Sequence, residues 1–299
     1  MSPVAAVDIG GTRTRIALFA EGEHEPREWK EFPTPRGGDV LEEISAALRE
    51  LPGIGAVGVG CPGPLDPRSG VVLNPPNLSA AWWGLEVAGI LEERLGVPAA
   101  LENDANLGAL GESAHGGGCG RDPVLYVTVS TGIGTGLVVG GEIFGGARGY
   151  AVELGHAPIT DGPRCRCGRF GCPEVVASGT AIARRAREAG RRVGAGGARE
   201  VLEAAAGGDG LARRVVEASA RDLGRALANA VYAYDPEVVL LGGGVSQSDL
   251  FLELAREAVE AEITLPAFRG VEIRRAHLGE RSGIYGARAL AERRAASPG

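Results

Sequence analysis

A repeated strand–turn–strand pattern constrains the fold of this chain more than any other feature. VAAVDIGGTRTRIALF at residues 4–19 aligns without a gap with VLYVTVSTGIGTGLVV at residues 124–139, an offset of 120 residues. Each copy has an apolar segment, a turn rich in Gly, Ser and Thr, and a second apolar segment, which is typical of paired buried strands. The repeat indicates either a duplicated fold with one such hairpin in each half, or two unrelated β-hairpins.

The segments around this repeat alternate between strand and helix patterns, which predicts an α/β fold. Short apolar runs predict further strands at residues 56–59, 99–101 and 238–241. Apolar residues at helical spacing predict helices at residues 85–95, 211–234 and 284–296. Asp39 and Glu42 form a capping-box pattern that would open another helix at residue 39, and residues 190–197 are typical of a surface loop. No long linker appears, so two lobes would be tightly joined.

Three glycine-rich turns follow apolar strands, at residues 8–12, 130–136 and 242–244. Glycine allows successive backbone N–H groups to converge on phosphate oxygens, and Ser or Thr hydroxyls add further donors. Neither the P-loop pattern GxxxxGK[ST] nor a GxGxxG that opens a helix is present, which argues against a P-loop ATPase and a Rossmann dehydrogenase. The three turns together predict a phosphate-binding protein of another class.

Acidic and amide side chains follow two of the predicted strands. Asp8 precedes the first turn, where its carboxylate could hold Mg²⁺ through water or could simply cap the turn. Asn103 and Asp104 follow the strand at 99–101 and could bind a hydroxyl-rich ligand, with Asp104 accepting a proton from an attacking hydroxyl. Spacing alone favours a helix N-cap for this pair over a ligand-binding role.

Three of the five cysteines, Cys165, Cys167 and Cys172, lie within eight residues of one another. With His156 they form a Cys₃His set, which is a known composition of structural zinc sites, although C-x-C is tighter than the usual zinc-finger spacing. A disulfide would leave one of the three unpaired, and clustered cysteines in a reducing compartment are more often metal ligands. The remaining cysteines, Cys61 and Cys119, have no partner in the sequence pattern.

The charge and hydropathy of the chain argue against two classes of partner. Its net charge of −7 disfavours binding to nucleic acid or to an anionic membrane surface. No apolar run approaches the roughly 20 residues that a membrane span needs. The N-terminal residues MSPVAAVDIGG show no charged region followed by an apolar one, so we expect no signal peptide and a cytoplasmic location.

Eight motifs spread over the chain resemble those of the ROK family (repressors, open reading frames, kinases). They are AVDIGGT at 6–12, VGCPGPLD at 59–66, NPPNL at 74–78, LENDANLGALGE at 101–112, STGIGTGLV at 130–138, ELGH at 153–156, CRCGRFGCPE at 165–174 and LGGGVS at 241–246. The resemblance implies a duplicated, two-lobed actin-like fold of the sugar-kinase/Hsp70 type (ribonuclease H-like), with ATP in the cleft between two α/β lobes. It implies a smaller N-terminal lobe of residues 1–113 plus 283–299 and a larger C-terminal lobe of residues 114–282.

The resemblance also implies ATP-dependent phosphorylation of a hexose, most often glucose at its 6-hydroxyl. N-acetylglucosamine, N-acetylmannosamine, mannose and fructose are alternative substrates, and polyphosphate is an alternative donor. A sugar-responsive repressor of the same family would carry an N-terminal helix-turn-helix, whereas this chain begins at its first predicted strand. We expect a homodimer or homotetramer, with no nucleic-acid or membrane partner.

The site residues that the resemblance implies fall into five groups. Asp104 is the catalytic base, and Asn103, Glu153, His156 and Glu174 bind sugar hydroxyls. The residues near the phosphates are Asp8, which would organise Mg²⁺, with Gly10, Gly11, Thr12, Arg13, Thr131 and Gly132. Gly243 and Gly244 lie at the nucleoside. The ligands of a structural Zn²⁺ are His156, Cys165, Cys167 and Cys172. Two residues depart from the family pattern, because Arg13 replaces a common Lys and Val152 replaces a common Gly before Glu153.

Overall fold

A computed structural model describes residues 2–296, which form two compact units. Within that range the first unit contains residues 2–116, 143–151 and 281–296, and the second contains residues 117–142 and 152–280. We expected residues 143–151 in the C-terminal lobe, but they belong to the first unit. Gly149 shows the reason, since a Cβ placed on it would lie 2.8 Å from Cγ of Pro67 in that unit.

The first unit is built on a five-stranded sheet with the order β3-β2-β1-β4-β8. β1 is antiparallel to β2 and parallel to β4, and β4 is parallel to β8. The strands are β1 (Val4–Ile9), β2 (Arg13–Phe19), β3 (Glu28–Pro33), β4 (Ala56–Cys61) and β8 (Ala99–Asn103). A small second sheet contains β5 (Leu65–Asp66), β6 (Val71–Val72) and β7 (Leu85–Glu86).

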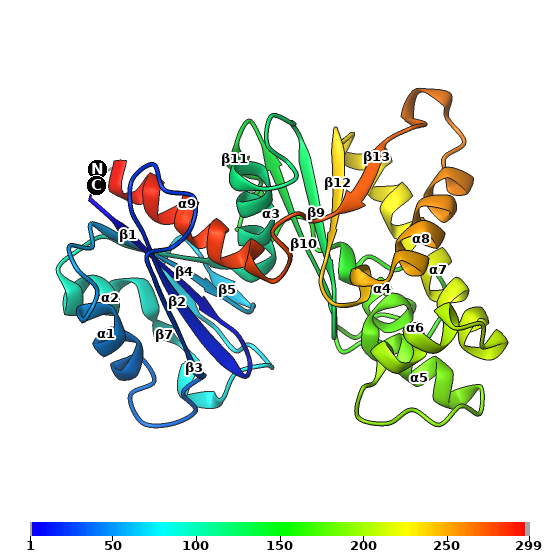
Figure 1. The fold of residues 1–299 in the computed structure, drawn as a ribbon, viewed down its shortest axis with the longest axis horizontal. Helices are drawn as coiled ribbons and strands as arrows, with labels where there is room; N and C mark the ends of the chain where they lie inside the picture. Colours follow the sequence, from blue (N-terminus) through cyan, green and yellow to red (C-terminus); the bar gives the residue numbers. More distant parts are fainter. Residues whose placement is uncertain (1, 297–299) are drawn as a thin grey trace. The chain divides into compact units, whose positions relative to one another are not determined.

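Helices cover both faces of this sheet (Figure 1). They are α1 (Glu42–Arg49), α2 (Val87–Leu95), α3 (Asp104–His115) and α9 (Ser282–Ala296), with 3₁₀ turns at Ala80–Trp82 and Gly279–Arg281. Val57 and Val59 pack into the core with α1 and α2. Gly58 faces the other way, because side chains alternate along a strand, and a Cβ on it would lie 1.9 Å from the Ala287 carbonyl oxygen of α9. A side chain at residue 58 would therefore push α9 off the sheet.

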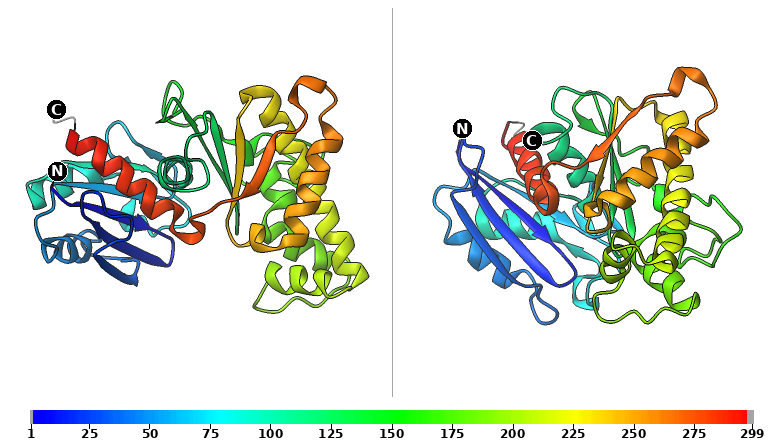
Figure 2. Two further views of the ribbon diagram at one scale, coloured as in Figure 1. Left: turned by 45° about the horizontal axis from the view of Figure 1, so that its top comes forward. Right: turned by 45° about the vertical axis from the view of Figure 1, so that its right-hand side comes forward.

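The second unit has a sheet with the order β11-β10-β9-β12-β13. Its strands are β9 (Val124–Val129), β10 (Ile133–Val139), β11 (Glu142–Ile143), β12 (Val238–Gly242) and β13 (Glu272–Arg275). Its helices are α4 (Pro173–Ala177), α5 (Gly179–Glu188), α6 (Ala198–Ala206), α7 (Gly210–Tyr234) and α8 (Asp249–Glu262), with 3₁₀ turns at Leu154–His156, Val245–Gln247 and Pro266–Phe268. α7 and α8 lie side by side in both views of Figure 2.

The repeat seen in the sequence corresponds to two equivalent hairpins, which confirms the duplication. β1 and β9 have the same bounds at the 120-residue offset, and so do β2 and β10. The register differs by one residue, since Ile9 pairs with Thr14 in the first hairpin while Val129 pairs with Ile133 in the second. The second turn is therefore one residue shorter than the first.

Three predicted helix starts differ from the observed ones. α1 begins at Glu42 rather than at Asp39, because the Asp39 carboxylate accepts the Leu41 N–H (3.1 Å) and forms a turn instead of a cap. α2 begins at Val87 because Leu85 pairs with Val72 in the small sheet. α9 begins at Ser282, two residues before the predicted start. Within residues 2–296, no helix has the length and apolar character that crossing a membrane requires.

Candidate functional site

The candidate residues of the first unit lie at the carboxyl ends of parallel strands. Asp8 pairs with Gly60 near the end of β1, and Cys61 pairs with Asn103 at the ends of β4 and β8. Ligands of open α/β sheets bind outside this edge of the sheet. The register therefore brings Asp8, Cys61 and Asn103 to one edge, directly before the start of α3.

Asn103 is the N-cap of α3, as the capping alternative predicted. Its Oδ1 accepts the N–H groups of Ala105 (2.9 Å) and Asn106 (3.4 Å). Its amide NH₂ group is the part that can still face a ligand. Asp104 is the first residue of the helix, and its Oδ1 also accepts the Ala105 N–H at 2.9 Å. The positive end of the helix dipole stabilises a carboxylate at that position.

Burial, together with two acidic groups near this edge, determines the protonation state of Cys61. Burial raises the pKa of the Cys61 thiol, and the carboxylates of Asp104 and Asp8 raise it further. Cys61 is therefore a thiol rather than a thiolate, which makes it neither a nucleophile nor a metal ligand. Burial also raises the pKa of Asp8, while the Arg15 guanidinium, 3.7 Å away, lowers it.

The turn between β1 and β2 is fixed by bonds to its carbonyl groups. Thr34 donates its N–H to the Thr12 carbonyl (3.0 Å) and its hydroxyl to the Gly10 carbonyl (2.6 Å). Arg13, the residue that departs from the family pattern, forms an ion pair with Glu31 at 2.5 Å on the adjacent strand β3. The guanidinium of Arg13 is thus directed towards β3.

In the second unit, Glu153, His156 and Glu174 are electrostatic neighbours. Burial raises the pKa of Glu153, His156 lowers it, and the carboxylate of Glu174 raises it again. Glu153 is the central residue of an inverse γ-turn, with φ −76° and ψ 60°, closed by the Leu154 N–H on the Val152 carbonyl at 2.8 Å. Two carboxylates and an imidazole in one place suit a ligand rich in hydroxyl groups.

The backbone around Glu153 is constrained on both sides. Val152 has φ 64°, a left-handed conformation that is a genuine outlier for a β-branched residue, and its carbonyl accepts the Thr135 hydroxyl. A Cβ on Gly155 would lie 2.3 Å from the Ile133 carbonyl oxygen, so the segment can approach β10 only with glycine there. Both constraints place Glu153 and His156 against the second hairpin.

The four predicted zinc ligands converge. One ligand atom from each of His156, Cys165, Cys167 and Cys172 lies within 4.8 Å of the other three. His156 Nδ1 is 3.5 Å from Cys165 Sγ, and Cys167 Sγ is 3.6 Å from Cys172 Sγ. A tetrahedral zinc ion separates N and S ligands by about 3.5–3.8 Å, so the residues fit such an ion. A disulfide is not formed, because its sulfurs would be about 2.05 Å apart.

The short helix α4 connects the cysteine cluster to the second phosphate turn. Cys172 is its N-cap residue and Pro173 its first residue, so Glu174 lies in the first turn. One carboxylate oxygen of Glu174 lies 2.7 Å from the position that a Cβ on Gly132 would occupy. The candidate sugar ligand Glu174 therefore contacts the candidate phosphate turn.

A cavity of about 970 Å³ in the second unit joins the predicted phosphate and nucleoside residues. Thr131 and Gly244 both line it. Its apolar lining includes Ala183, Ala198, Leu202, Ala206, Val245 and Leu250. Gly243 has φ 80°, and a Cβ there would lie 2.4 Å from the Val129 carbonyl oxygen. The cavity has the apolar walls that a nucleobase requires, and it begins at Ser130 and Thr131 of the predicted phosphate turn.

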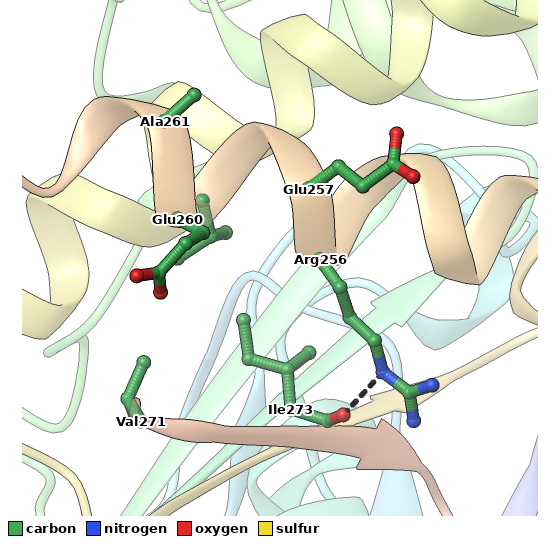
Figure 3. Close-up of a pocket in the computed structure, with 7 residues that line it drawn as sticks. Arg256, Glu257, Glu260, Ala261, Val271 and Ile273 are labelled. Carbon is green, nitrogen blue, oxygen red and sulfur yellow. Dashed lines mark hydrogen bonds between the residues drawn. The ribbon is translucent and has the colours of Figure 1, made fainter. Parts of the chain in front are cut away.

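A further cavity of about 610 Å³, between α8 and β13, contains none of the candidate residues (Figure 3). Arg256 crosses its mouth and donates its Nε–H to the Ile273 carbonyl at 2.7 Å. β13 is the last strand in the order of its sheet, so this bond satisfies a carbonyl that no further strand pairs.

Sequence reasoning missed Thr34 and Thr180, whose hydroxyls bond to carbonyls of the two phosphate turns. The Ser178-Gly-Thr180 run was visible as a helix N-cap pattern, and Ser178 does cap α5 through the Ala181 N–H. No pattern could show that Thr180 contacts Thr131, which lies 49 residues earlier.

The sheet order shared by the two units, with a glycine-containing hairpin in each, defines the class of fold, which is the two-lobed actin-like ATPase fold. The ROK family pattern matches residues 4–294, and the chain belongs to the ROK family. Glucokinase of Thermotoga maritima is 34% identical to it, with 96% of both chains covered.

Two solved structures support the same assignment. The ROK hexokinase of Thermus thermophilus has a TM-score of 0.88 and 38% identity, covering 97% of this chain and 98% of that one. A ROK family glucokinase from Streptomyces griseus, in complex with glucose and AMPPNP, has a TM-score of 0.82 and 32% identity, covering 97% and 99%. The protein is therefore a sugar kinase that transfers phosphate to a hydroxyl group.

Proposed function

We propose that this kinase uses ATP to phosphorylate the 6-hydroxyl of glucose, giving glucose 6-phosphate. The observation that carries the proposal is the group of Glu153, His156 and Glu174 beside Gly132 of a phosphate turn. Carboxylates accept hydrogen bonds from sugar hydroxyls, and an imidazole can donate or accept one. A sugar bound there would lie close to a donor phosphate, as phosphoryl transfer requires.

In the proposed mechanism Asp104 accepts the proton of the 6-hydroxyl as its oxygen attacks the γ-phosphorus and ADP leaves. The N-terminus of α3 favours the ionised carboxylate that a base needs. Backbone N–H groups of the two turns, at residues 11–12 and 131–132, would donate to the phosphate oxygens on which negative charge accumulates. Mg²⁺ bound with ATP would neutralise part of that charge, and we propose Asp8 as the residue that holds it through water.

We propose ATP rather than polyphosphate as the donor. The apolar walls of the 970 Å³ cavity suit an adenine ring, and Gly244, which lines it, leaves open space where a side chain would begin. Polyphosphate would instead need a continuous cationic track. Of the two arginines that line the cavity, Arg199 is paired with Glu203 at 2.8 Å.

We also propose a structural zinc ion held by His156, Cys165, Cys167 and Cys172. The 3.5 Å between His156 Nδ1 and Cys165 Sγ and the 3.6 Å between Cys167 Sγ and Cys172 Sγ support this proposal, because they match the ligand separations around a tetrahedral ion. The Nδ1 atom of His156 faces Cys165, so Nε2 is the ring nitrogen that can bond to the sugar. The ion would thus orient His156 and hold the start of α4, and with it Glu174. We place the enzyme in the cytoplasm and expect a homodimer or homotetramer.

A coupled kinase assay over glucose, mannose, fructose, N-acetylglucosamine and N-acetylmannosamine, with ATP and with polyphosphate, tests the proposal. We expect the highest kcat/KM for glucose with ATP. A higher value for an N-acetylated sugar would assign the enzyme to that hexose instead. Absence of turnover with every hexose would contradict the proposed function.

A further inference from the structure

The second phosphate turn is bound from behind by the first two residues of α5. Gly179 donates its N–H to the Ser130 carbonyl at 2.7 Å, and Thr180 donates its hydroxyl to the Thr131 carbonyl at 2.8 Å. A Cβ on Gly179 would lie 2.8 Å from the same Ser130 oxygen, so α5 approaches the turn as closely as glycine permits. The carbonyl groups of Ser130 and Thr131 are thereby occupied.

These two bonds determine where the N–H groups of the turn point. In a trans peptide the C=O and the following N–H point in opposite directions within one plane. The bond from Gly179 to the Ser130 carbonyl therefore orients the Thr131 N–H away from α5. In the same way, the bond from Thr180 to the Thr131 carbonyl orients the Gly132 N–H away from α5.

The first hairpin is bound in the same way by unrelated residues. At the positions equivalent to Ser130 and Thr131, the Gly10 carbonyl accepts the Thr34 hydroxyl (2.6 Å) and the Gly11 carbonyl accepts Arg36 Nη2 (3.4 Å). Donors behind both turns therefore occupy the same two carbonyls. Because both hairpins have these bonds although the donors differ, we infer that the turn needs its carbonyl groups to be bound, whichever element supplies the donors.

We propose that Thr180 is a positioning residue for phosphoryl transfer, which fixes the Thr131–Gly132 peptide so that its N–H can donate to the donor phosphate. This inference rests on the proposed function, in which that turn binds the phosphates of ATP. Thr180 also lines the 970 Å³ cavity, so the alternative role to be distinguished is direct contact with the nucleoside.

The test is Thr180→Val, which keeps the shape of the side chain and removes the hydroxyl. Loss of one hydrogen bond predicts a KM for ATP higher by about 3- to 10-fold and a lower kcat, with an unchanged hexose KM. Thr180→Ser should restore both values. Calorimetric titration should show weaker binding of AMPPNP to Thr180→Val and unchanged binding of adenosine, because the variant disturbs the phosphate turn alone.

Ser178→Ala is the matched control, because it removes the cap of the same helix without touching the turn. It should lower the melting temperature and leave the KM for ATP unchanged. The proposal would be overturned if Ser178→Ala raised the KM for ATP as much as Thr180→Val does. It would also be overturned if Thr180→Val had the ATP kinetics of the wild type, or if it lost as much affinity for adenosine as for AMPPNP. If the wild type phosphorylated no hexose, the proposed function would fail, while AMPPNP titration would still test the role of Thr180.

Discussion

Val152 is a single residue at which the structure stores strain beside a candidate sugar ligand. Its φ of 64° costs a β-branched residue on the order of 1–3 kcal/mol, and its carbonyl bonds to Thr135 and Leu154 hold it there. Such strain is concentrated at functional sites. Since family members commonly have glycine at this position, Val152 is the residue most able to alter the geometry of Glu153.

Comparison of Val152→Gly with Val152→Ala measures this strain. Both variants lose the two buried γ-methyl groups of the valine, but only glycine adopts positive φ without cost. We expect the glycine variant to be more stable than the alanine variant by about 1 kcal/mol in urea unfolding, the reverse of the order in ordinary strand positions. Greater stability of the alanine variant would show that φ at residue 152 is not strained.

Asp104→Asn tests the proposed base. The asparagine oxygen can still accept the Ala105 N–H, so the melting temperature should change little. Because the side chain can no longer take the proton, kcat should fall by about 100- to 10,000-fold while hexose binding by calorimetry remains. Turnover within a few-fold of wild type would mean that another group accepts the proton.

Glu102 should make the stability of the protein depend on pH. Burial raises its pKa above the ordinary 4.5, although its bonds from Asn106 and the Asn103 N–H lower it. The folded state then binds the proton more tightly than the unfolded state. The resulting stability is fully present below about pH 4.5 and is lost as the pH rises through the folded-state pKa.

Glu102→Gln removes this dependence and keeps an oxygen that can accept both hydrogen bonds. In urea unfolding from pH 4 to pH 8, the variant should gain stability relative to wild type as the pH rises above about 4.5, and the gain should then level off. Exposed Glu43→Gln serves as the control and should show no such gain. A difference between Glu102→Gln and wild type that stays constant over this range would contradict the expectation.

Among the helices and strands, α4 links the proposed zinc, sugar and phosphate sites. It follows the zinc-ligand candidate Cys172, carries Glu174, and leads directly into α5, whose first residues bind the phosphate turn. Five residues are too few for a stable isolated helix, so its position depends on what holds its ends. The proposed zinc ion would provide that restraint at its N-terminus through Cys172.

Cys167→Ser tests this dependence. The variant should lose metal, with affinity for zinc lower by more than about tenfold, and its hexose KM should rise because His156 and Glu174 are no longer held. Metal analysis by mass spectrometry and glucose kinetics give the two values. Cys119→Ser is the matched control, an exposed free cysteine outside the cluster, and should retain both metal and KM. If Cys167→Ser lost its metal but kept the wild-type hexose KM, the metal would not be needed to position the sugar ligands, and the expectation would be contradicted.

At the scale of the whole molecule, the two units have the same sheet order, but the turns of their equivalent hairpins differ in length. The first turn has four residues between the paired Ile9 and Thr14, and the second has three between Val129 and Ile133. In both turns the carbonyl groups of the first two residues nevertheless accept hydrogen bonds from donors outside the hairpin. The duplication therefore preserves these hydrogen bonds more strictly than the length of the turns.

Much of this organisation could be predicted from the residues alone. Buried strands such as β1 and β9 are short apolar runs, and α7 follows helical periodicity between the Asp209 cap and Pro236, because these signals are local. The Cys₃His set was equally visible, since three of its four ligands lie within eight residues. Local sequence thus determined the strands, the duplication and the composition of the metal cluster.

Only the tertiary structure decided which distant groups meet. β7 replaced the predicted start of α2 because Leu85 pairs with Val72, and residues 143–151 belong to the first unit because Gly149 lies against Pro67. The contact of Glu174 with Gly132 and the bond of Thr180 to Thr131 join residues more than 40 positions apart. Periodicity and capping patterns extend over one turn or one strand, whereas these contacts depend on how the helices pack on the sheet.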